Sequence, residues 1–567
     1  MNATRFFLPL QNPIGFGAAD FIELVFATVL LGLLLTSRSR LVTYVRTLSR
    51  SGLWSMVTLF VLPVVLRLAL LAHCPIPTPA VSDDFSYVLL ADTLRHWRLA
   101  NPPHPLPQFF ETFFVLQEPT YSSIFPLGQG LILAIGWTLF GHPWAGVAIS
   151  IGAFCALCYW MLRAWVTPEW AFIGGLLAVL EFGPLNQSMN SFWGGAVSAS
   201  AGCLVFGALP RLRAGGRARD AILLGLGLGI QLLTRPYESL FLLLSVFVFL
   251  LDKPPACQAQ AGGLRNRLQL MLVTVIVVIP TLALTLLQNK RVTGSWTTLP
   301  YMQSRYQYGV PATFTWQPNP VPHRELTPQQ QLDFQLQSQI HGSGTDTLSS
   351  YCSRLGSRVR YYRFFFLAPL YLALPGFLLA FRERRFVWVA GTVLLFALGT
   401  NFYPYFYSHY IAAITCLFIL ISVTALEVLG RVGKLILFLC AAHYLLWYGI
   451  YLIGDQNAIL AMSRYETWDA INRGDPEGRI AIRTELEKAP GKQLIFVRYA
   501  PQHQFNEWIH NGADIDSSRI VWARDLGAEE DEKLRRYYPD RTVWLVEPDV
   551  RPPRLTRISP VITAPRL

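Results

Sequence analysis

Long apolar runs separated by short polar turns dominate the chain as far as Ile453. A helix needs about 20 apolar residues to cross a bilayer, and most of these runs reach or approach that length. The pattern predicts spans near Ala18–Thr36, Leu53–Ala72, Leu127–Phe140, Trp144–Trp165, Trp170–Phe182, Trp193–Leu209, Ala221–Leu251, Leu268–Leu287, Tyr361–Phe381, Phe386–Thr400, His409–Leu429 and Leu435–Ile453. We therefore expect a mostly α-helical fold, a polytopic transmembrane bundle of about 12–13 spans.

The run at Ala221–Leu251 poses a topological choice, because Arg235, Pro236 and Glu238 interrupt it. Proline and charges in mid-run indicate either one kinked span or two half-spans. One span would place the arginines at 211–219 outside, against the positive-inside rule. Two half-spans would place them inside, but one earlier run would then fail to cross. We favour the single kinked span, and in both cases the break should be buried or line a cavity.

The basic residues that follow the first run predict the orientation of the chain. Arg38, Arg40, Arg46 and Arg50 favour a cytoplasmic loop, so the second span should lead to the extracytoplasmic face. We expect a multi-pass protein of the cell (inner) membrane with its active site outside. The predicted domains are 1–52, an extra span and loop; 53–454, the membrane domain with outer loops 73–123 and 289–360; and 455–567, an extracytoplasmic α/β domain.

Local patterns predict the elements outside the bundle. Apolar residues recur at helical spacing over Phe85–Leu99, which predicts an amphipathic juxtamembrane helix, and a second short helix is expected near Phe109–Gln117. In the C-terminal segment we expect strands at Gln493–Tyr499, Arg519–Ala523 and Thr542–Glu547, with a helix at Glu529–Tyr538.

Composition supports the membrane assignment. Of 567 residues, 52% are hydrophobic and only 14% are charged, whereas soluble domains carry roughly a quarter charged residues. The net charge is +12, but many arginines lie in short turns between apolar runs. That placement favours contacts with membrane lipid over nucleic acid, for which no binding motif is present. Cys155 and Cys158 form a CxxC inside a predicted helix, which we interpret as packing.

Two adjacent carboxylates, Asp83 and Asp84, follow the second predicted span. Charges near a bilayer are costly and are more often functional than decorative. A carboxylate beside a basic group in a low-dielectric site can act as a general base, so these two residues are our catalytic candidates. The alternative is a helix cap, with Ser82 or Asp83 capping a helix that starts near Phe85 and Asp84 favouring its dipole.

Other polar and aromatic residues should gather on the same face. Arginine suits phosphate because its fork matches phosphate oxygens, and aromatic platforms suit sugars. The candidate substrate-binding residues are Tyr87, His104, Glu118, Tyr121, Asn190, Trp193, Arg235, Tyr237, Glu238, His409 and Tyr410. Simpler interpretations stay open: the tyrosines could form an interfacial belt, Arg235 and Glu238 could neutralise each other, and His104 could be structural. No metal-ligand spacing stands out.

The order of these motifs resembles the GT-C glycosyltransferase superfamily, especially the protein O-mannosyltransferases and the lipid A aminoarabinose transferases. The resemblance covers roughly 53–430, and the outer loop 289–360 matches the family's second large loop in position. The matching pieces, in chain order, are Asp83-Asp84-Phe85-Ser86-Tyr87, Phe125-Pro126-Leu127, Gly225-Leu226-Gly227-Leu228-Gly229 and Leu233-Thr234-Arg235-Pro236.

The resemblance implies inverting transfer of a sugar from a polyprenyl-phosphate donor to a glycan, lipid or protein acceptor. Asp83 matches the catalytic acid, which would act as base on an acceptor hydroxyl. The segment before Pro126 lacks the His or Lys common in relatives, so Arg235 or His409 would contact the phosphate. The resemblance implies no cofactor, and it leaves open whether the reaction needs a divalent metal ion. The competing hypotheses are a transporter or flippase for a lipid-linked sugar, and a non-catalytic membrane scaffold.

Overall fold

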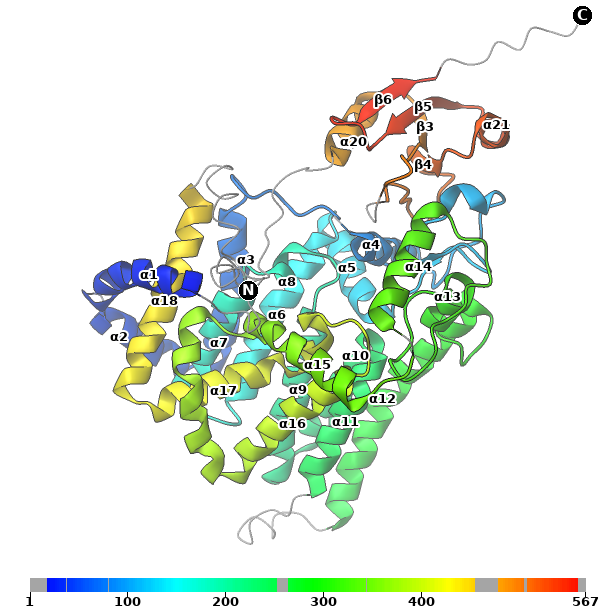
Figure 1. Cartoon of the computed structure of the whole chain (residues 1–567). Coiled ribbons are helices and arrows are strands. Elements are labelled where there is room, and N and C mark those ends of the chain that lie inside the picture. Colours follow the sequence, from blue (N-terminus) through cyan, green and yellow to red (C-terminus); the bar gives the residue numbers. More distant parts are fainter. Residues whose placement is uncertain are drawn as a thin grey trace, which may run out of the picture.

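A computed structural model describes residues 18–36, 38–79, 81–251, 264–342, 344–453, 478–503 and 507–558. A helical bundle fills most of the molecule, and a small domain lies at one end of it (Figure 1). Within the described residues, five helices are long and apolar enough to cross a membrane: Gly52–Ala69, Trp144–Leu162, Leu268–Thr293, Ser408–Val428 and Arg431–Ile453. The mostly helical fold with a C-terminal α/β unit is as the sequence predicted.

Shorter helices run beside these five and complete the bundle. The segment at 359–382 is a series of 3-10 turns, η5 (Val359–Phe365), η6 (Ala368–Leu372) and η7 (Leu374–Arg382). The core between the helices is closely packed, and Cys155 and Cys158 are fully buried in it. The helices are α1 (Ala18–Thr36), α2 (Arg38–Ser49), α3 (Gly52–Ala69), α6 (Trp144–Leu162), α7 (Pro168–Phe182), α8 (Gln187–Asn190), α9 (Ala196–Arg213), α12 (Leu264–Thr293), α16 (Arg384–Thr400), η8 (Ser408–Ile414), α17 (Thr415–Val428) and α18 (Arg431–Ile453).

The prediction of a single kinked span at 221–251 is wrong. The structure has two helices, α10 (Ala218–Thr234) and α11 (Pro236–Leu251), with Arg235 between them. α10 runs antiparallel to α9, since Ser198 at the start of α9 donates to Gln231 near the end of α10 at 2.6 Å. α11 then returns, so Phe249 near its end lies under Arg213. Proline cannot continue the hydrogen-bonded ladder of α10, which explains the break.

The earlier run that fails to cross is α5 (Leu127–Phe140). It lies beside the juxtamembrane helix α4 (Ser82–Arg95): a Cβ at Gly130 would meet Leu90 at 2.5 Å, and Arg95 stacks on Trp137 at 4.3 Å. Both ends of α5 therefore stay on the face of the bundle that carries Asp83, here called the Asp83 face. The turn between α9 and α10, with its four arginines, lies on the opposite face of the bundle.

The first outer loop differs in part from its predicted elements. The amphipathic helix is present as α4 but begins at Ser82, so Ser82 and Asp83 are not its caps; Val81 holds the N-cap position. The prediction of a short helix near Phe109–Gln117 is wrong. That stretch forms a 3-10 turn, η3 (Pro107–Phe110), and a hairpin of β1 (Val115–Leu116) with β2 (Ser122–Ser123).

The C-terminal domain is a small α/β unit, and its elements are those that the pattern predicted, with α20 and β6 added. Its sheet has the order β4-β3-β5-β6, with β3 parallel to β4 and β5, and β6 antiparallel at the edge. It rests on α4 and on the second outer loop (Figure 1). Its elements are α20 (Arg479–Lys488), β3 (Lys492–Val497), β4 (Ile520–Arg524), α21 (Ala528–Tyr537), β5 (Arg541–Glu547) and β6 (Arg554–Arg557).

A buried polar junction joins both outer loops to the C-terminal domain. The second outer loop contains α13 (Pro300–Tyr308), α14 (Pro328–His341) and α15 (Leu348–Arg358). Arg324 pairs with Glu111 at 2.6 Å, and Arg524 pairs with Glu507 and hydrogen-bonds Gln329 of α14. Buried charges are tolerated when paired and hydrogen-bonded, so the junction requires all three parts to be docked.

The corrected topology can be tested by cysteine labelling. In a chain whose Cys257 and Cys352 are serine, Ala214→Cys reports the turn between α9 and α10, and Ser517→Cys reports the C-terminal domain; both positions are exposed. We expect a membrane-impermeant maleimide to label the two sites from opposite sides of sealed vesicles, because an odd number of crossings separates them. Labelling of both from the same side would restore the single kinked span.

Candidate active site

Helix α4 turns its two adjacent carboxylates in different directions. Successive helical residues are about 100° apart, so Asp83 and Asp84 cannot face the same neighbours. Asp84 is buried, at 3% exposure, and its Oδ1 accepts a hydrogen bond from the backbone N–H of Phe192 at 2.8 Å. Asp84 therefore attaches the start of α4 to the segment between α8 and α9, which is a structural role.

Asp83 instead faces Arg235 and stays partly exposed. Burial, and after it the Asp84 charge, raises the pKa of the Asp83 carboxyl to about 7 against the opposing effect of Arg235. Within the described part of the chain, the Asp83 carboxylate accepts a hydrogen bond only from its own backbone and forms no ion pair. It is thus a carboxylate with protein around it, some solvent access and a pKa near neutrality.

Arg235 occupies the break between α10 and α11 on the Asp83 face. Its guanidinium lies over the ring of Tyr410 at 4.9 Å, and Tyr87, Glu238 and Tyr301 are its electrostatic neighbours. Across the described ranges, the guanidinium makes no hydrogen bond and no ion pair, with Glu238 included. Arg235 and Glu238 therefore interact through their charges but do not form a direct ion pair.

The residues Asp83, Tyr87, Arg235, Glu238 and Tyr410, here called the Asp83 cluster, come from α4, the break between α10 and α11, the start of α11, and η8. Tyr87 is buried and stacks on Phe125 at 4.2 Å. The other predicted aromatic residues adjoin the cluster: the ring centroids of Trp193 and His409 are 4.8 Å apart, as are those of His409 and Tyr410. The structure thus brings together seven of the predicted site residues.

The remaining predicted residues have structural contacts elsewhere. His104 contacts Tyr538 and Asp516 of the C-terminal domain, and Tyr121 donates to the Asn511 carbonyl. Glu118 pairs with Arg324 at 2.9 Å. Two further residues belong to this group: Asn190 accepts from Arg67 and donates to two carbonyls, and Tyr237 donates to the Gly399 carbonyl.

Sequence reasoning missed two residues from the second outer loop. Tyr301 of α13 is an electrostatic neighbour of Arg235, and Asp333 of α14 is one of Asp83. Burial raises the pKa of Asp333 to about 6, while hydrogen bonds from Gln337 oppose that shift. No local signal marks either residue, because each reaches the cluster only through the docking of a loop distant in sequence.

The described part of the chain contains no group of three or more His, Cys, Asp or Glu side chains arranged to hold a metal ion. The Asp83 cluster presents two carboxyl groups, Asp83 and Glu238, and one permanent cation, Arg235, beside the hydroxyls of Tyr87 and Tyr410. This combination can accept a proton and stabilise negative charge on a second group.

The division of labour between the two carboxylates predicts different effects on stability. Asp84→Ala leaves the buried N–H of Phe192 without a partner, which should cost about 1–3 kcal/mol. Asp83→Ala removes no such bond and relieves repulsion, so its effect should stay within about 0.5 kcal/mol. Thermal unfolding of both variants in detergent measures the difference. Equal destabilisation would contradict the structural role of Asp84.

The chain was compared with known proteins. No protein-family model matches it, and no curated protein matches it by sequence. Among solved structures, it is similar to ArnT, a lipid A aminoarabinose transferase from Cupriavidus metallidurans, bound to undecaprenyl phosphate. The identity is 11%, the TM-score is 0.50, and the match covers 87% of this chain and 92% of ArnT.

Two further structures match less well. The apo form of the same ArnT gives a TM-score of 0.48 at 12% identity, over 88% of this chain and 93% of ArnT. An oligosaccharyltransferase from Archaeoglobus fulgidus, in complex with zinc and sulfate, gives 0.42 at 12% identity, over 86% and 67%. The fold is compared with the undecaprenyl-phosphate-bound ArnT structure, because its TM-score is the highest of the three. The chain has the polytopic helical fold of this ArnT structure, which agrees with the fold that its sequence motifs suggested.

Proposed function

We propose that this chain transfers a sugar from a polyprenyl-phosphate donor to an acceptor hydroxyl. The observation that carries the proposal is the approach of Asp83 and Arg235 without a direct ion pair. A base and a phosphate-binding cation are thereby held near each other, and both keep some exposure. Solved structures of this fold include one with undecaprenyl phosphate bound, which supports a lipid-phosphate donor.

In the proposed step, the Asp83 carboxylate takes the proton of the acceptor hydroxyl. The acceptor oxygen attacks the anomeric carbon, and the bond from that carbon to the phosphate oxygen breaks. The lipid phosphate leaves with the electron pair, and the sugar is inverted at the anomeric carbon. A carboxylate whose pKa lies near 7 suits this work, because about half of it is ionised at neutral pH and it is basic enough to hold the proton.

Arg235 is the better candidate for the phosphate. Its charge is permanent, and its fork matches phosphate oxygens. Its guanidinium lies over the Tyr410 ring, and its N–H groups are not used by the described residues. His409 is packed against Trp193 and Tyr410, so we assign it to shaping the site. The phosphate charge that develops on departure would be stabilised by Arg235.

We further propose that the Asp83 face is extracytoplasmic and that the protein resides in the inner membrane. The turn with Arg211, Arg213, Arg217 and Arg219 lies on the opposite face of the bundle, and basic turns favour the cytoplasm. The donor would then enter from the bilayer and the acceptor from outside. The sugar and the acceptor class, whether glycan, lipid or protein, are left open by this proposal.

The catalytic role of Asp83 is tested by sugar transfer in membranes supplied with radiolabelled polyprenyl-phosphate sugars. Asp83→Asn should lower the rate about 10²–10⁴-fold, since general base catalysis contributes that much. Asp540→Asn, whose side chain is 63% exposed in the C-terminal domain, is the matched control and should transfer normally. Transfer by Asp83→Asn at the wild-type rate would refute the proposal.

The raised pKa of Asp83 predicts a pH dependence. Because the ionised form is the base, kcat/KM should fall about tenfold per pH unit below about 7 and reach a plateau above it. Asp84→Asn removes a neighbouring negative charge that raises the Asp83 pKa, so its profile should shift to lower pH. The measurement is kcat/KM from pH 5 to 9 for both proteins. A shift to higher pH would contradict the electrostatic coupling.

A further inference from the structure

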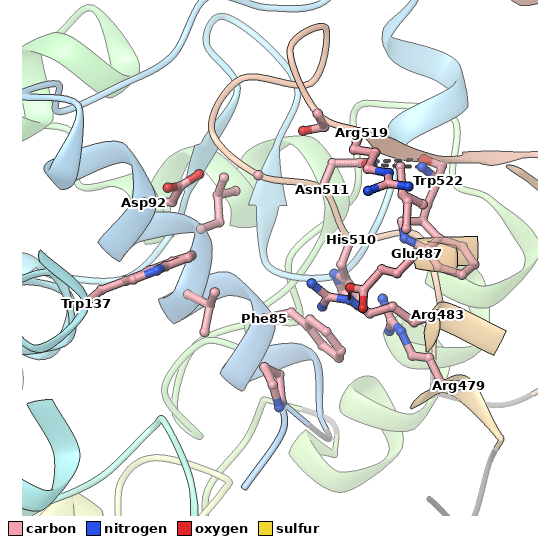
Figure 2. A pocket seen from close by; sticks show the side chains of 16 residues that line it. Phe85, Asp92, Trp137, Arg479, Arg483, Glu487, His510, Asn511, Arg519 and Trp522 are labelled. Atoms are coloured by element: carbon pink, nitrogen blue, oxygen red, sulfur yellow. Dashed lines mark hydrogen bonds and ion pairs between the residues drawn. The ribbon is translucent and has the colours of Figure 1, made fainter. Parts of the chain in front are cut away.

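A pocket of about 350 Å³ lies between α4, α5 and the C-terminal domain. Figure 2 shows Phe85 and Asp92 of α4 and Trp137 of α5 on one side, opposite side chains of the C-terminal domain. Ligand pockets begin at about 300 Å³, so this volume is sufficient for a small polar headgroup. The residues that line this pocket include none of the catalytic or substrate-binding candidates predicted from the sequence.

Helix α4 separates this pocket from the Asp83 cluster. The lining residues Phe85, Val88, Leu89 and Asp92 are spaced i, i+3, i+4 and i+7, so they share one face of the helix. At about 100° per residue, Asp83 lies roughly half a turn from the middle of that face. A ligand held in the pocket is therefore on the other side of α4 from the proposed reaction.

The C-terminal side of the pocket is cationic. Arg479 donates to the carbonyls of Glu507 and Trp508 and stacks on Phe85 at 4.2 Å, which fixes its position. Arg483 uses its Nε for Glu487, and both side chains are at least half exposed. Such exposed pairs contribute little energy, so Arg483 can exchange this partner for a ligand anion.

Arg519 supplies the third cation of this pocket. It is exposed and donates from Nη2 to the Ala489 carbonyl at 2.8 Å. The acid on the opposite wall is already engaged, since Asp92 pairs with Arg95 and accepts the Ala513 N–H. Three arginines therefore face two acids around the pocket, and one of those acids is occupied by partners that do not line it.

The pocket adjoins a surface that suits a bilayer. Trp137 lines it from α5, and the same helix exposes Ile135, Leu139 and Phe140, the last two at 68% and 66%. Exposed apolar side chains on a helix that lies along one face of a membrane bundle are covered by lipid at the interface. Tryptophan is itself favoured at that depth. The pocket thus opens where lipid headgroups are found.

From this arrangement the structure assigns the pocket as a binding site for the phosphate of an anionic membrane lipid. Arg483 and Arg519 contact the phosphate, Arg479 and the stacked rings of Phe85 and His510 form the floor, and Trp137 borders the acyl side. The site is separate from the donor site, and its occupancy does not depend on the proposed transfer reaction.

Native mass spectrometry of the full chain in neutral detergent tests the assignment. Phosphatidylglycerol is titrated against phosphatidylcholine, and the double variant Arg483→Gln/Arg519→Gln is compared with wild type. The control is Arg536→Gln/Arg554→Gln, which removes two charges from exposed positions of the same domain, outside the pocket. We expect preferential binding of phosphatidylglycerol, weakened at least tenfold in the pocket variant and less than twofold in the control.

The alternatives give different results. Equal affinity of the pocket variant and the control would overturn the site, because binding would then reflect net charge or lipid around the bundle. Competition by glycerol 3-phosphate at the affinity of phosphatidylglycerol would overturn the assignment to a lipid, since a soluble phosphate would suffice. A preference for phosphatidylglycerol that glycerol 3-phosphate does not displace at equal concentration supports the lipid site.

Discussion

The position of α4 depends on two carboxylates that accept backbone N–H groups from opposite sides. Asp84 accepts from Phe192 of the membrane bundle, and Asp92 accepts from Ala513 of the C-terminal domain. A poorly solvated carboxylate is stable only when donors satisfy it, and charge-assisted bonds are roughly twice as strong as neutral ones. These two bonds fix the helix between the two parts. The direction in which Asp83 points follows from that constraint.

The neighbouring positions of Asp83 and Asp84 explain why one dipeptide has two roles. Asp84 uses its oxygens within the protein, whereas Asp83 accepts a hydrogen bond from its own backbone. Because the Asp84 charge is fixed one residue away, it makes ionisation of Asp83 less favourable, and Arg235 partly restores it. Burial raises the basicity of Asp83 most, and the same carboxylate that holds the helix in place raises it further.

The sequence predicted what local pattern determines, namely most helices of the bundle, the three parallel strands of the C-terminal domain and Asp83 and Arg235 as candidates on one face. The prediction from sequence failed where the hydropathy of a run is compatible with two placements in the membrane. An apolar run of 14 residues such as α5 can lie along a face or cross, and only packing against α4 decides. Residues such as Asp333 were missed, and His104 proved to contact the C-terminal domain, because long-range docking leaves no periodic trace.

Helix α14 connects the surroundings of Asp83 with the C-terminal domain, which lies outside the part of the chain that resembles the family. Gln329 and Gln330 hydrogen-bond Arg524 and Glu111 in the buried junction, and Asp333 on the same helix is an electrostatic neighbour of Asp83. Buried ion pairs are costly to separate once desolvated, so docking of the domain fixes α14. The domain thereby contributes to the electrostatic environment of Asp83 without contacting it.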